Sequence, residues 1–362
     1  MMENEETIDN KEKKVETETT ISQCPSCGSG LFYDPKSMGL KCKSCNSIFD
    51  FEKNKDNLKL DYLDSKVENY DWSLETRVFH CDTCGAEILI TGYDVTTVCP
   101  YCGSGYVSKT DKLPGLKPNR VLPFAFNETD AQAYFKKGVR KYFFAPRAIK
   151  KKIPENKIRG LLIPSFTFDS NTFSSYDGVL EKVESYRDSK GNLKTKTKRF
   201  NISGSKAINY RDLVIESSSK FEQKQINSLL PYDMNGSYHF DYNFLRGYSV
   251  EHYQDSLDHC YSKAKNIMDE DIKRKILSGY NYTSVVRLNV STNYNDRMYS
   301  YILLPIYTFE FEYRKKRYVT LMNGQTGKIN NKLPISPIKV SILILLIILA
   351  IVAVVLFIML SE

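Results

Sequence analysis

Eight of the nine cysteines fall into two cassettes of the same design, and each cysteine of the first lies 57 residues before its counterpart in the second. Their positions are Cys24, Cys27, Cys42 and Cys45 in the first cassette and Cys81, Cys84, Cys99 and Cys102 in the second. Two Cys-x-x-Cys pairs separated by fourteen residues can place four thiolates in a tetrahedron, which is the geometry that structural zinc prefers. The spacing therefore predicts two zinc ribbons that hold two structural Zn²⁺ ions.

The flanking residues favour metal binding over the two alternatives for this spacing, which are disulfides and redox-active dithiols. Gly28, Gly85 and Gly103 directly follow the second cysteine of a pair, where the backbone often needs a positive φ. Disulfides need an export route, and residues 1–20 contain no apolar export segment. Each ribbon is too small to fold by apolar burial, so metal binding would supply most of its folding free energy. Four protein ligands leave no open position on zinc, which argues against zinc catalysis.

The charge distribution bears on whether the ribbons bind nucleic acid. Residues 20–110 carry nine Lys or Arg against twelve acidic residues, whereas residues 111–362 carry 39 against 24. Nucleic-acid-binding modules draw most of their non-specific affinity from basic side chains on phosphates. Each four-thiolate zinc centre adds about two further negative charges. The acidic ribbons therefore favour a protein partner over nucleic acid, and a small local basic patch is the alternative.

The segment Val340–Leu360 is apolar throughout except for Ser341. A helix of 21 residues spans about 31 Å, close to the hydrocarbon thickness of a bilayer. We therefore expect a single-pass transmembrane helix. Lys328, Lys332 and Lys339 precede it and no Lys or Arg follows, so the positive-inside rule predicts a tail anchor with cytoplasmic N-terminal domains.

The region between the ribbons and this segment predicts a mixed α+β domain with an antiparallel sheet. A short strand is expected over residues 121–126, followed by a helix that Asn127 can cap. Strands follow from Leu161, and the sequence DSKGN at 188–192 predicts a hairpin turn.

The sequence of the second half of this domain predicts two helices and a meander of three strands. The helices are expected over residues 222–230 and 249–277. The stretch 284–329 predicts a three-stranded meander with turns near Asn295 and Lys315.

Three groups in this domain resemble sites of chemistry. His252, Asp255 and His259 are spaced to share a face of the predicted helix, but no further group converges on them, so surface pairing is preferred. The sequence GQTGK at 324–328 has two residues between its glycines where a phosphate loop has four, so it predicts a turn. Cys260 belongs to neither cassette, and we expect it to be buried as a small apolar residue. No catalytic set is evident, and we expect a protein that is not an enzyme.

These patterns divide the chain into eight segments. They are an acidic disordered tail (1–20), zinc ribbon 1 (21–51), a linker (52–76), zinc ribbon 2 (77–108), a linker (109–120), the α+β domain (121–330), a juxtamembrane spacer (331–339) and the transmembrane helix (340–360). Within the α+β domain, the stretch 136–159 holds ten Lys or Arg and one acid. This stretch either contacts anionic lipid headgroups or forms a solvated basic surface.

The order of these features resembles a family of bacterial TFIIB-type zinc-ribbon membrane proteins. Its most specific part is YILLPIYTFEFEYRKKRYVTLMNGQTGKI at 301–329, which precedes LPIS and the apolar segment. The ribbon cysteines match the paired pattern of that family. The resemblance implies an adaptor in the bacterial cell membrane that works with SPFH (flotillin-like) or PspA-type proteins in the envelope stress response. The alternative is a membrane-tethered zinc-ribbon protein that binds nucleic acid.

Overall fold

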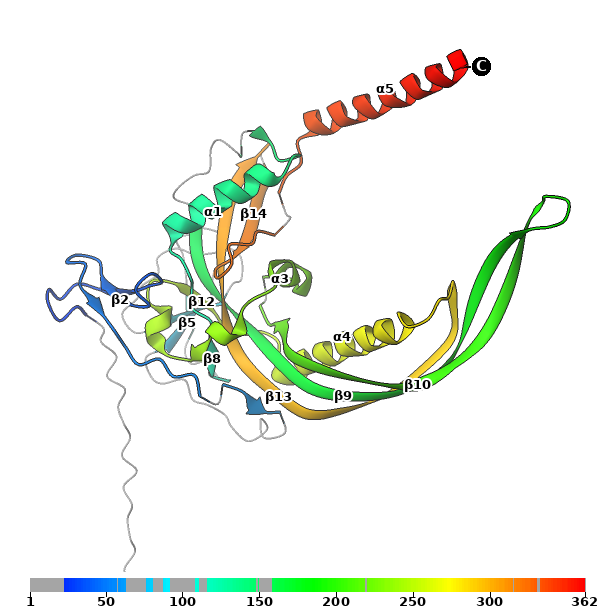
Figure 1. The fold of residues 1–362 in the computed structure, drawn as a ribbon. Helices are drawn as coiled ribbons and strands as arrows, with labels where there is room; N and C mark the ends of the chain where they lie inside the picture. Colours follow the sequence, from blue (N-terminus) through cyan, green and yellow to red (C-terminus); the bar gives the residue numbers. More distant parts are fainter. Residues whose placement is uncertain are drawn as a thin grey trace, which may run out of the picture.

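A large β-sheet runs through the computed structural model and carries most of its buried residues (Figure 1). The structure describes residues 23–56, 58–62, 76–80, 87–91, 108–110, 116–147, 149, 158–218, 220–314, 316–330 and 333–361.

Two strands of 30 residues each organise the large sheet. Strands β9 (Ile158–Arg187) and β13 (Ser284–Tyr313) pair antiparallel along most of their length. Strand β10 (Leu193–Glu216) returns along β9, and β14 (Lys316–Asn323) returns along β13. One end of these strands lies in the body of the molecule, and the other end extends from it as a curved arm (Figure 1). The arm comprises residues 171–210 of β9 and β10 and residues 284–295 of β13.

The turns expected in these strands have different outcomes. The hairpin turn at 188–192 is confirmed, because Leu193 pairs with Arg187 across it. The prediction of a turn near Asn295 is wrong. Strand β13 continues through this point with a shift of register, and Asp296 has a positive φ of 49°. Such a bulge absorbs extra residues without reversing the strand. The turn near Lys315 is confirmed by the pairing of β13 with β14, and Arg314 has a φ of 51° there.

Short strands complete the large sheet. They are β4 (Leu60–Asp61), β5 (Thr76–His80), β6 (Glu87–Thr91), β7 (Ser108–Thr110), β8 (Arg120–Val121), β11 (Tyr238–His239) and β12 (Ser249–Glu251). Strand β8 runs parallel to β13, and β12 runs parallel to β9, so the sheet is mixed. The expectation of an antiparallel sheet is corrected at these two pairs, because β8 and β12 join their neighbours through crossovers rather than hairpins. The strand expected over 121–126 has only Arg120 and Val121 in the sheet.

Local capping explains where the helices begin. Helix α1 (Glu128–Lys141) starts after Asn127, whose Oδ1 accepts a hydrogen bond of 3.0 Å from the backbone of Asp130, as expected. Helix α3 (Gln223–Leu229) matches the prediction for 222–230. Helix α4 (Leu257–Leu277) begins later than expected, because Ser256 caps it and the chain before it forms β12. Two 3₁₀ turns, η3 (Met234–Gly236) and η4 (Tyr242–Leu245), lie between α3 and β12.

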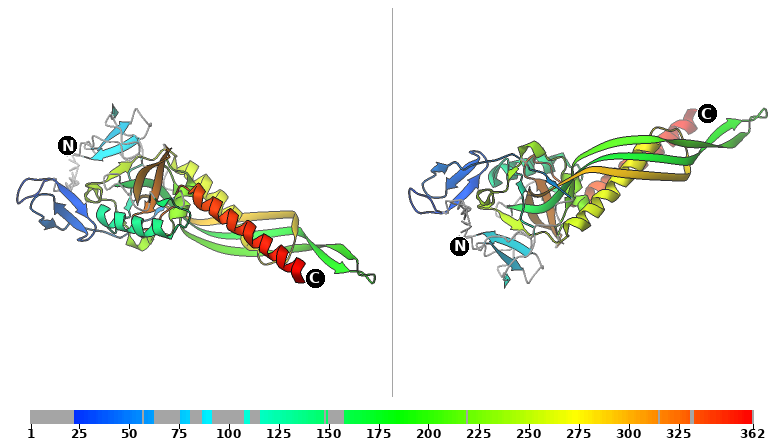
Figure 2. Two further views of the ribbon diagram at one scale, coloured as in Figure 1. Left: turned by 90° about the horizontal axis from the view of Figure 1, so that it is seen from above. Right: turned by 90° about the horizontal axis from the view of Figure 1, so that it is seen from below.

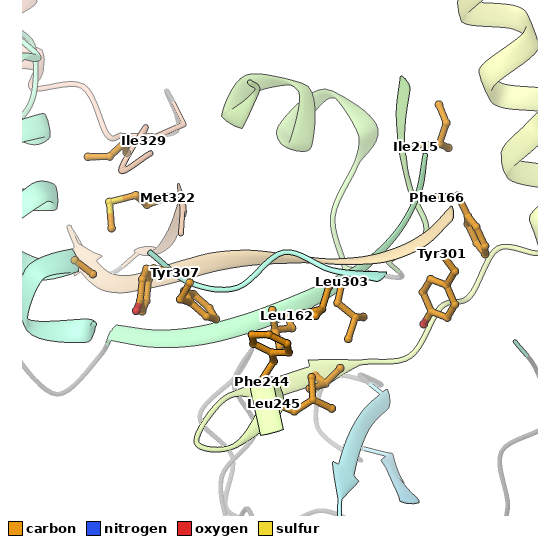
Figure 3. Close-up of a cluster of buried hydrophobic side chains, with 14 of the residues drawn as sticks. Leu162, Phe166, Ile215, Phe244, Leu245, Tyr301, Leu303, Tyr307, Met322 and Ile329 are labelled. Atoms are coloured by element: carbon orange, nitrogen blue, oxygen red, sulfur yellow. The ribbon is translucent and has the colours of Figure 1, made fainter. Parts of the chain in front are cut away.

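The body is apolar on both faces of the sheet. Along β13, Tyr301, Leu303 and Tyr307 point into one cluster, part of which Figure 3 shows, while Ile302 and Leu304 point into the other. Helix α1 covers the first face, and α3 packs on the second. Burial on both faces explains why 301–309 is a nearly continuous apolar run.

Helix α5 (Pro337–Ser361) projects from the body at the C-terminal end of the described chain (Figures 1 and 2). Its 23 residues from Pro337 to Met359 are long and apolar enough to cross a membrane, and none of its most apolar window is buried. Its first turn is tied to the body, where Lys339 Nζ donates hydrogen bonds to the carbonyl oxygens of Phe143 (2.6 Å) and Ala145 (2.8 Å).

Candidate metal centre

The four cysteines of the first cassette converge on one point. The Sγ atoms of Cys24, Cys27, Cys42 and Cys45 all lie within 4.8 Å of one another. The separation is 3.5 Å between Cys24 and Cys45 and 3.4 Å between Cys27 and Cys42. Sulfur atoms at the corners of a tetrahedron around zinc would be about 3.8 Å apart for a Zn–S bond of about 2.3 Å. The arrangement fits one metal ion, and none of these thiols forms a disulfide.

Two tight turns deliver these thiols in pairs. In the first turn the backbone N–H groups of Cys27 and Gly28 both donate to the carbonyl of Cys24, at 3.3 and 2.8 Å. Gly28 and Asn46, which follow the second cysteine of each pair, have positive φ values of 71° and 60°. Asparagine tolerates this conformation better than most residues other than glycine. The small antiparallel sheet β1 (Leu31–Asp34), β2 (Gly39–Cys42) and β3 (Ile48–Phe49) joins the two turns.

The second pair of thiols is set up to ionise. A hydrogen bond between Cys45 Sγ and Ser47 Oγ, 3.1 Å long, lowers the pKa of Cys45 to about 6. Hydrogen bonds from the backbone lower the pKa of Cys42, and the N–H of Ser44 lies 3.4 Å from its sulfur. A thiolate is the form of cysteine that binds a metal, so these contacts favour metal binding at this pair, whereas the pKa of Cys27 is raised and its proton must leave when a metal binds.

This first cassette is packed against the body. Tyr33 on β1 is 1 % exposed, and its backbone N–H donates a 3.0 Å hydrogen bond to the carbonyl of Arg246. Its ring lies 5.3 Å from the ring of Phe244 and 6.4 Å from that of Phe51, between ring centres. At the edge of this contact Lys36 forms an ion pair of 3.1 Å with Asp130 at the start of α1.

A cavity of about 310 Å³ lies beside this contact. The cassette contributes Phe32, Pro35 and Lys43 to its lining, and the body contributes the start of α1 and the segment 246–248. The cleft therefore lies between the first cassette and the body, and Lys43, next to the metal-binding Cys42, is at its edge.

The cysteines of the second cassette, Cys81, Cys84, Cys99 and Cys102, lie outside the described residues. Strand β6 follows the first of these pairs, as β1 follows the first pair of cassette 1. It pairs with β5 and with β12, and β5 pairs with β7. The described strands of this region are thus part of the large sheet. A second metal site stays a prediction.

The other groups singled out in the sequence do not form a site. His252 and Asp255 both precede α4, and His259 alone of the three lies on it, so the prediction of a shared helix face is wrong. Asp255 instead contacts Lys263 at 2.5 Å, and His259 lies 3.8 Å from Asp255. The turn at 324–328 is confirmed, with Gly327 at a φ of 73°. Cys260 is fully buried, as expected.

A pair of buried carboxylates was not anticipated. Glu216 at the end of β10 and Glu251 at the end of β12 are 5 % and 0 % exposed. Ser218 lies between them: its N–H donates to Glu216 (2.9 Å) and its hydroxyl donates to Glu251 (2.6 Å). Burial raises the pKa of Glu216 to about 7, and the charge of Glu251 adds to the shift. The only signal in the sequence is an acid at the end of an apolar run, as in DLVIES.

Comparisons with known proteins give one informative relative. The uncharacterized protein YdjG of Bacillus subtilis (strain 168) is 28% identical over 325 residues, which cover 88% of this chain and 91% of that protein. The likeness is therefore much longer than the cysteine-rich region. No family model matches the chain. No solved structure matches it either.

Proposed function

We propose that this chain is a tail-anchored membrane adaptor that holds a protein partner at the cytoplasmic surface of a bacterial membrane. The observation that carries the proposal is α5, a membrane-length apolar helix that adds nothing to the core of the body. Exposing such a helix to water would be costly, whereas a bilayer accepts it. The lysines before it, including Lys328 and Lys339, orient the body toward the cytoplasm.

The metal centre has a structural role in this proposal. Zinc held by Cys24, Cys27, Cys42 and Cys45 fixes the first cassette, whose residues Phe32, Pro35 and Lys43 line the cleft against the body. A second zinc, held by Cys81, Cys84, Cys99 and Cys102, does the same for the second ribbon. Zinc with four thiolates supplies folding free energy and no open coordination position, so the ribbons bind a partner rather than catalyse a reaction.

The partner is a protein of the SPFH (flotillin-like) or PspA type, and the setting is the envelope stress response. Support for this partner comes from the sequence resemblance alone, because the relative YdjG is itself uncharacterized. The cleft between the first ribbon and the body offers such a partner apolar and basic contacts together, from Phe32, Pro35 and Lys43. The basic end of α1, with Arg140 and Lys141, lies near the start of α5 and meets the lipid headgroups.

Two steps test the proposal. Alkaline carbonate extraction of bacterial membranes compares the full chain with a chain that ends at Lys339. The full chain stays with the membranes and the shortened chain is released. Affinity purification of the full chain from detergent-solubilised membranes, followed by mass spectrometry, then identifies the bound proteins. Release of the full chain by carbonate, or purification without any stoichiometric partner, would contradict the proposal. Deleting the ribbons is a poor test, because β4 to β7 belong to the large sheet.

A further inference from the structure

The start of α5 is bonded to the loop that follows α1, residues 142–147. The N–H of Ser336, just before α5, donates a 2.8 Å hydrogen bond to the carbonyl of Phe144. Lys339 Nζ donates to the carbonyl of Phe143 at 2.6 Å and lies 5.5 Å from the centre of the Phe143 ring. Figure 1 shows the end of α1 near the start of α5. These bonds hold the loop level with the first turn of α5.

The length of the apolar segment places this first turn at the surface of a bilayer. The 23 residues from Pro337 to Met359 form a helix of about 35 Å, whereas the hydrocarbon core of a bilayer is about 30 Å thick. About one turn of the helix therefore lies outside the core. Lys339 assigns that turn to the N-terminal end, because an ammonium group stays in the headgroup layer.

Exposed apolar side chains are concentrated at this junction. Phe143 (68 %) and Ile335 (62 %) are the two most exposed large apolar residues of the described body, outside the arm and α5, and Ile48 (55 %) follows them. Ile338, in the first turn of α5, is 66 % exposed. Leaving such groups in water is costly, so their concentration in one place indicates that something covers them.

The loop presents Phe143 from a fixed position. The N–H of Ala145 donates a 3.1 Å hydrogen bond to the carbonyl of Tyr142, which closes a turn around Phe143. Ala145 is 2 % exposed and belongs to the main apolar cluster of the body, together with Ile149. The ring of Phe143 is therefore held outside by a backbone that is anchored inside.

Basic residues surround the exposed ring. Residues 136–147 hold five Lys or Arg and no acid, and Arg140, Lys141 and Arg147 are exposed. An aromatic side chain flanked by cations at the start of a membrane helix is typical of the headgroup layer. A protein partner would have to enter between the body and the surface into which α5 inserts. The bilayer around α5 already adjoins this position, so the position selects lipid.

We propose that Phe143 inserts into the headgroup layer of the bilayer that α5 enters, with Ile335 and Ile338 beside it. The body then rests on the membrane surface in one orientation instead of moving freely on a tether. The proposal rests on the membrane anchor of the proposed function. It adds an apolar contact, and the residues that make it, to the contact of basic side chains with headgroups.

The depth of a tryptophan probe in the bilayer tests this contact on the full chain. The single tryptophan of the chain is first removed with Trp72→Phe, and a probe is then introduced with Phe143→Trp or, separately, with Ile335→Trp. Each protein is reconstituted into vesicles that contain phospholipids brominated near the headgroup end or near the middle of the acyl chain. Bromine quenches the fluorescence of a tryptophan beside it, and acrylamide quenches a tryptophan in water.

Two further probes serve as references. Ile48→Trp is the matched control, because Ile48 is similarly exposed and its cassette lies at the end of the body away from α5 (Figure 2). Leu349→Trp lies near the middle of α5 and reports whether the anchor is inserted. Thermal unfolding at the temperature of the parent chain shows that a probe has not altered the fold.

We expect bromine near the headgroup to quench Phe143→Trp and Ile335→Trp at least about threefold more than Ile48→Trp. Quenching no stronger than that of Ile48→Trp, while Leu349→Trp is quenched, overturns the proposal and assigns the junction to a protein contact. Stronger quenching of Phe143→Trp by the deeper bromine also overturns it, because the loop would then lie in the hydrocarbon core. If bromine does not quench Leu349→Trp, the anchor itself has failed, and the contact that rests on it fails too.

Discussion

A substitution at Tyr33 tests most directly whether the first cysteine cassette is an integral part of the body. The substitution Tyr33→Ala removes a ring that is 1 % exposed and that packs on Phe244 and Phe51. An aromatic side chain buries about 150–250 Å², which at about 25 cal/mol per Å² corresponds to about 4–6 kcal/mol as an upper limit. Measured costs of replacing a buried aromatic residue with alanine are about 3–5 kcal/mol. We therefore expect Tyr33→Ala to lower the free energy of unfolding by about 3–4 kcal/mol.

The matched control is Tyr33→Phe, which removes only the contact of 3.1 Å between the hydroxyl and Met38 Sδ. Tyr33→Phe should lower the free energy of unfolding by less than about 1 kcal/mol, because a hydrogen bond to sulfur is weak. The assay is urea unfolding followed by circular dichroism on the chain that ends at Lys339, with zinc content measured in parallel. If Tyr33→Ala lowers the free energy of unfolding by less than about 1 kcal/mol while zinc is retained, the packing of the first cassette on the body is refuted.

Three further predictions concern the metal, the buried carboxylates and a turn. Plasma mass spectrometry should find two zinc ions per chain in the wild type and one in Cys42→Ser; an unchanged zinc content would exclude the first site. Glu216 has a folded pKa of about 7, above its ordinary value of 4.5, so folding retains its proton. Stability should fall as the pH rises from 4.5 to 7, by on the order of 2–3 kcal/mol, and Glu216→Gln should abolish this slope in urea titrations. A Cβ at Gly324 would lie 2.7 Å from the Phe124 ring and 2.8 Å from Pro305 Cβ, so Gly324→Ala should cost about 1–3 kcal/mol in the same assay; Gly30→Ala, with no atom nearby, is its control.

Local patterns in the sequence were sufficient to predict several elements of the structure. The first cysteine cassette was predictable because two knuckles with fixed spacing bring their own thiols together, and Gly28 provides the required backbone conformation. Helix α1 was predictable from the cap at Asn127, and the distal turn from DSKGN. Helix α5 follows from composition alone.

Long-range pairing could not be predicted in the same way. Nothing local distinguishes the bulge at Asp296 from a turn, because both need the same backbone conformation. The sheet decides between them, since β9 continues past this point as a partner for β13. Likewise, Ser249–Glu251 has no strand pattern of its own, and it forms β12 because β6 and β9 lie on either side. The burial of Tyr33 depends on Phe244, about two hundred residues away in the sequence, so its role required the structure.

The most direct measurement of zinc-dependent recruitment is the share of the partner found in the membrane fraction of cells. Three proteins are compared: the wild type, a cluster variant carrying Cys24→Ser and Cys27→Ser, and a control. The control is Cys260→Ala, which removes a cysteine outside the cluster. The proposed function predicts that the cluster variant itself stays in the membrane fraction while its partner becomes soluble, and that Cys260→Ala keeps both in the membrane. A partner that remains at the membrane in the cluster variant, at wild-type levels, would contradict it.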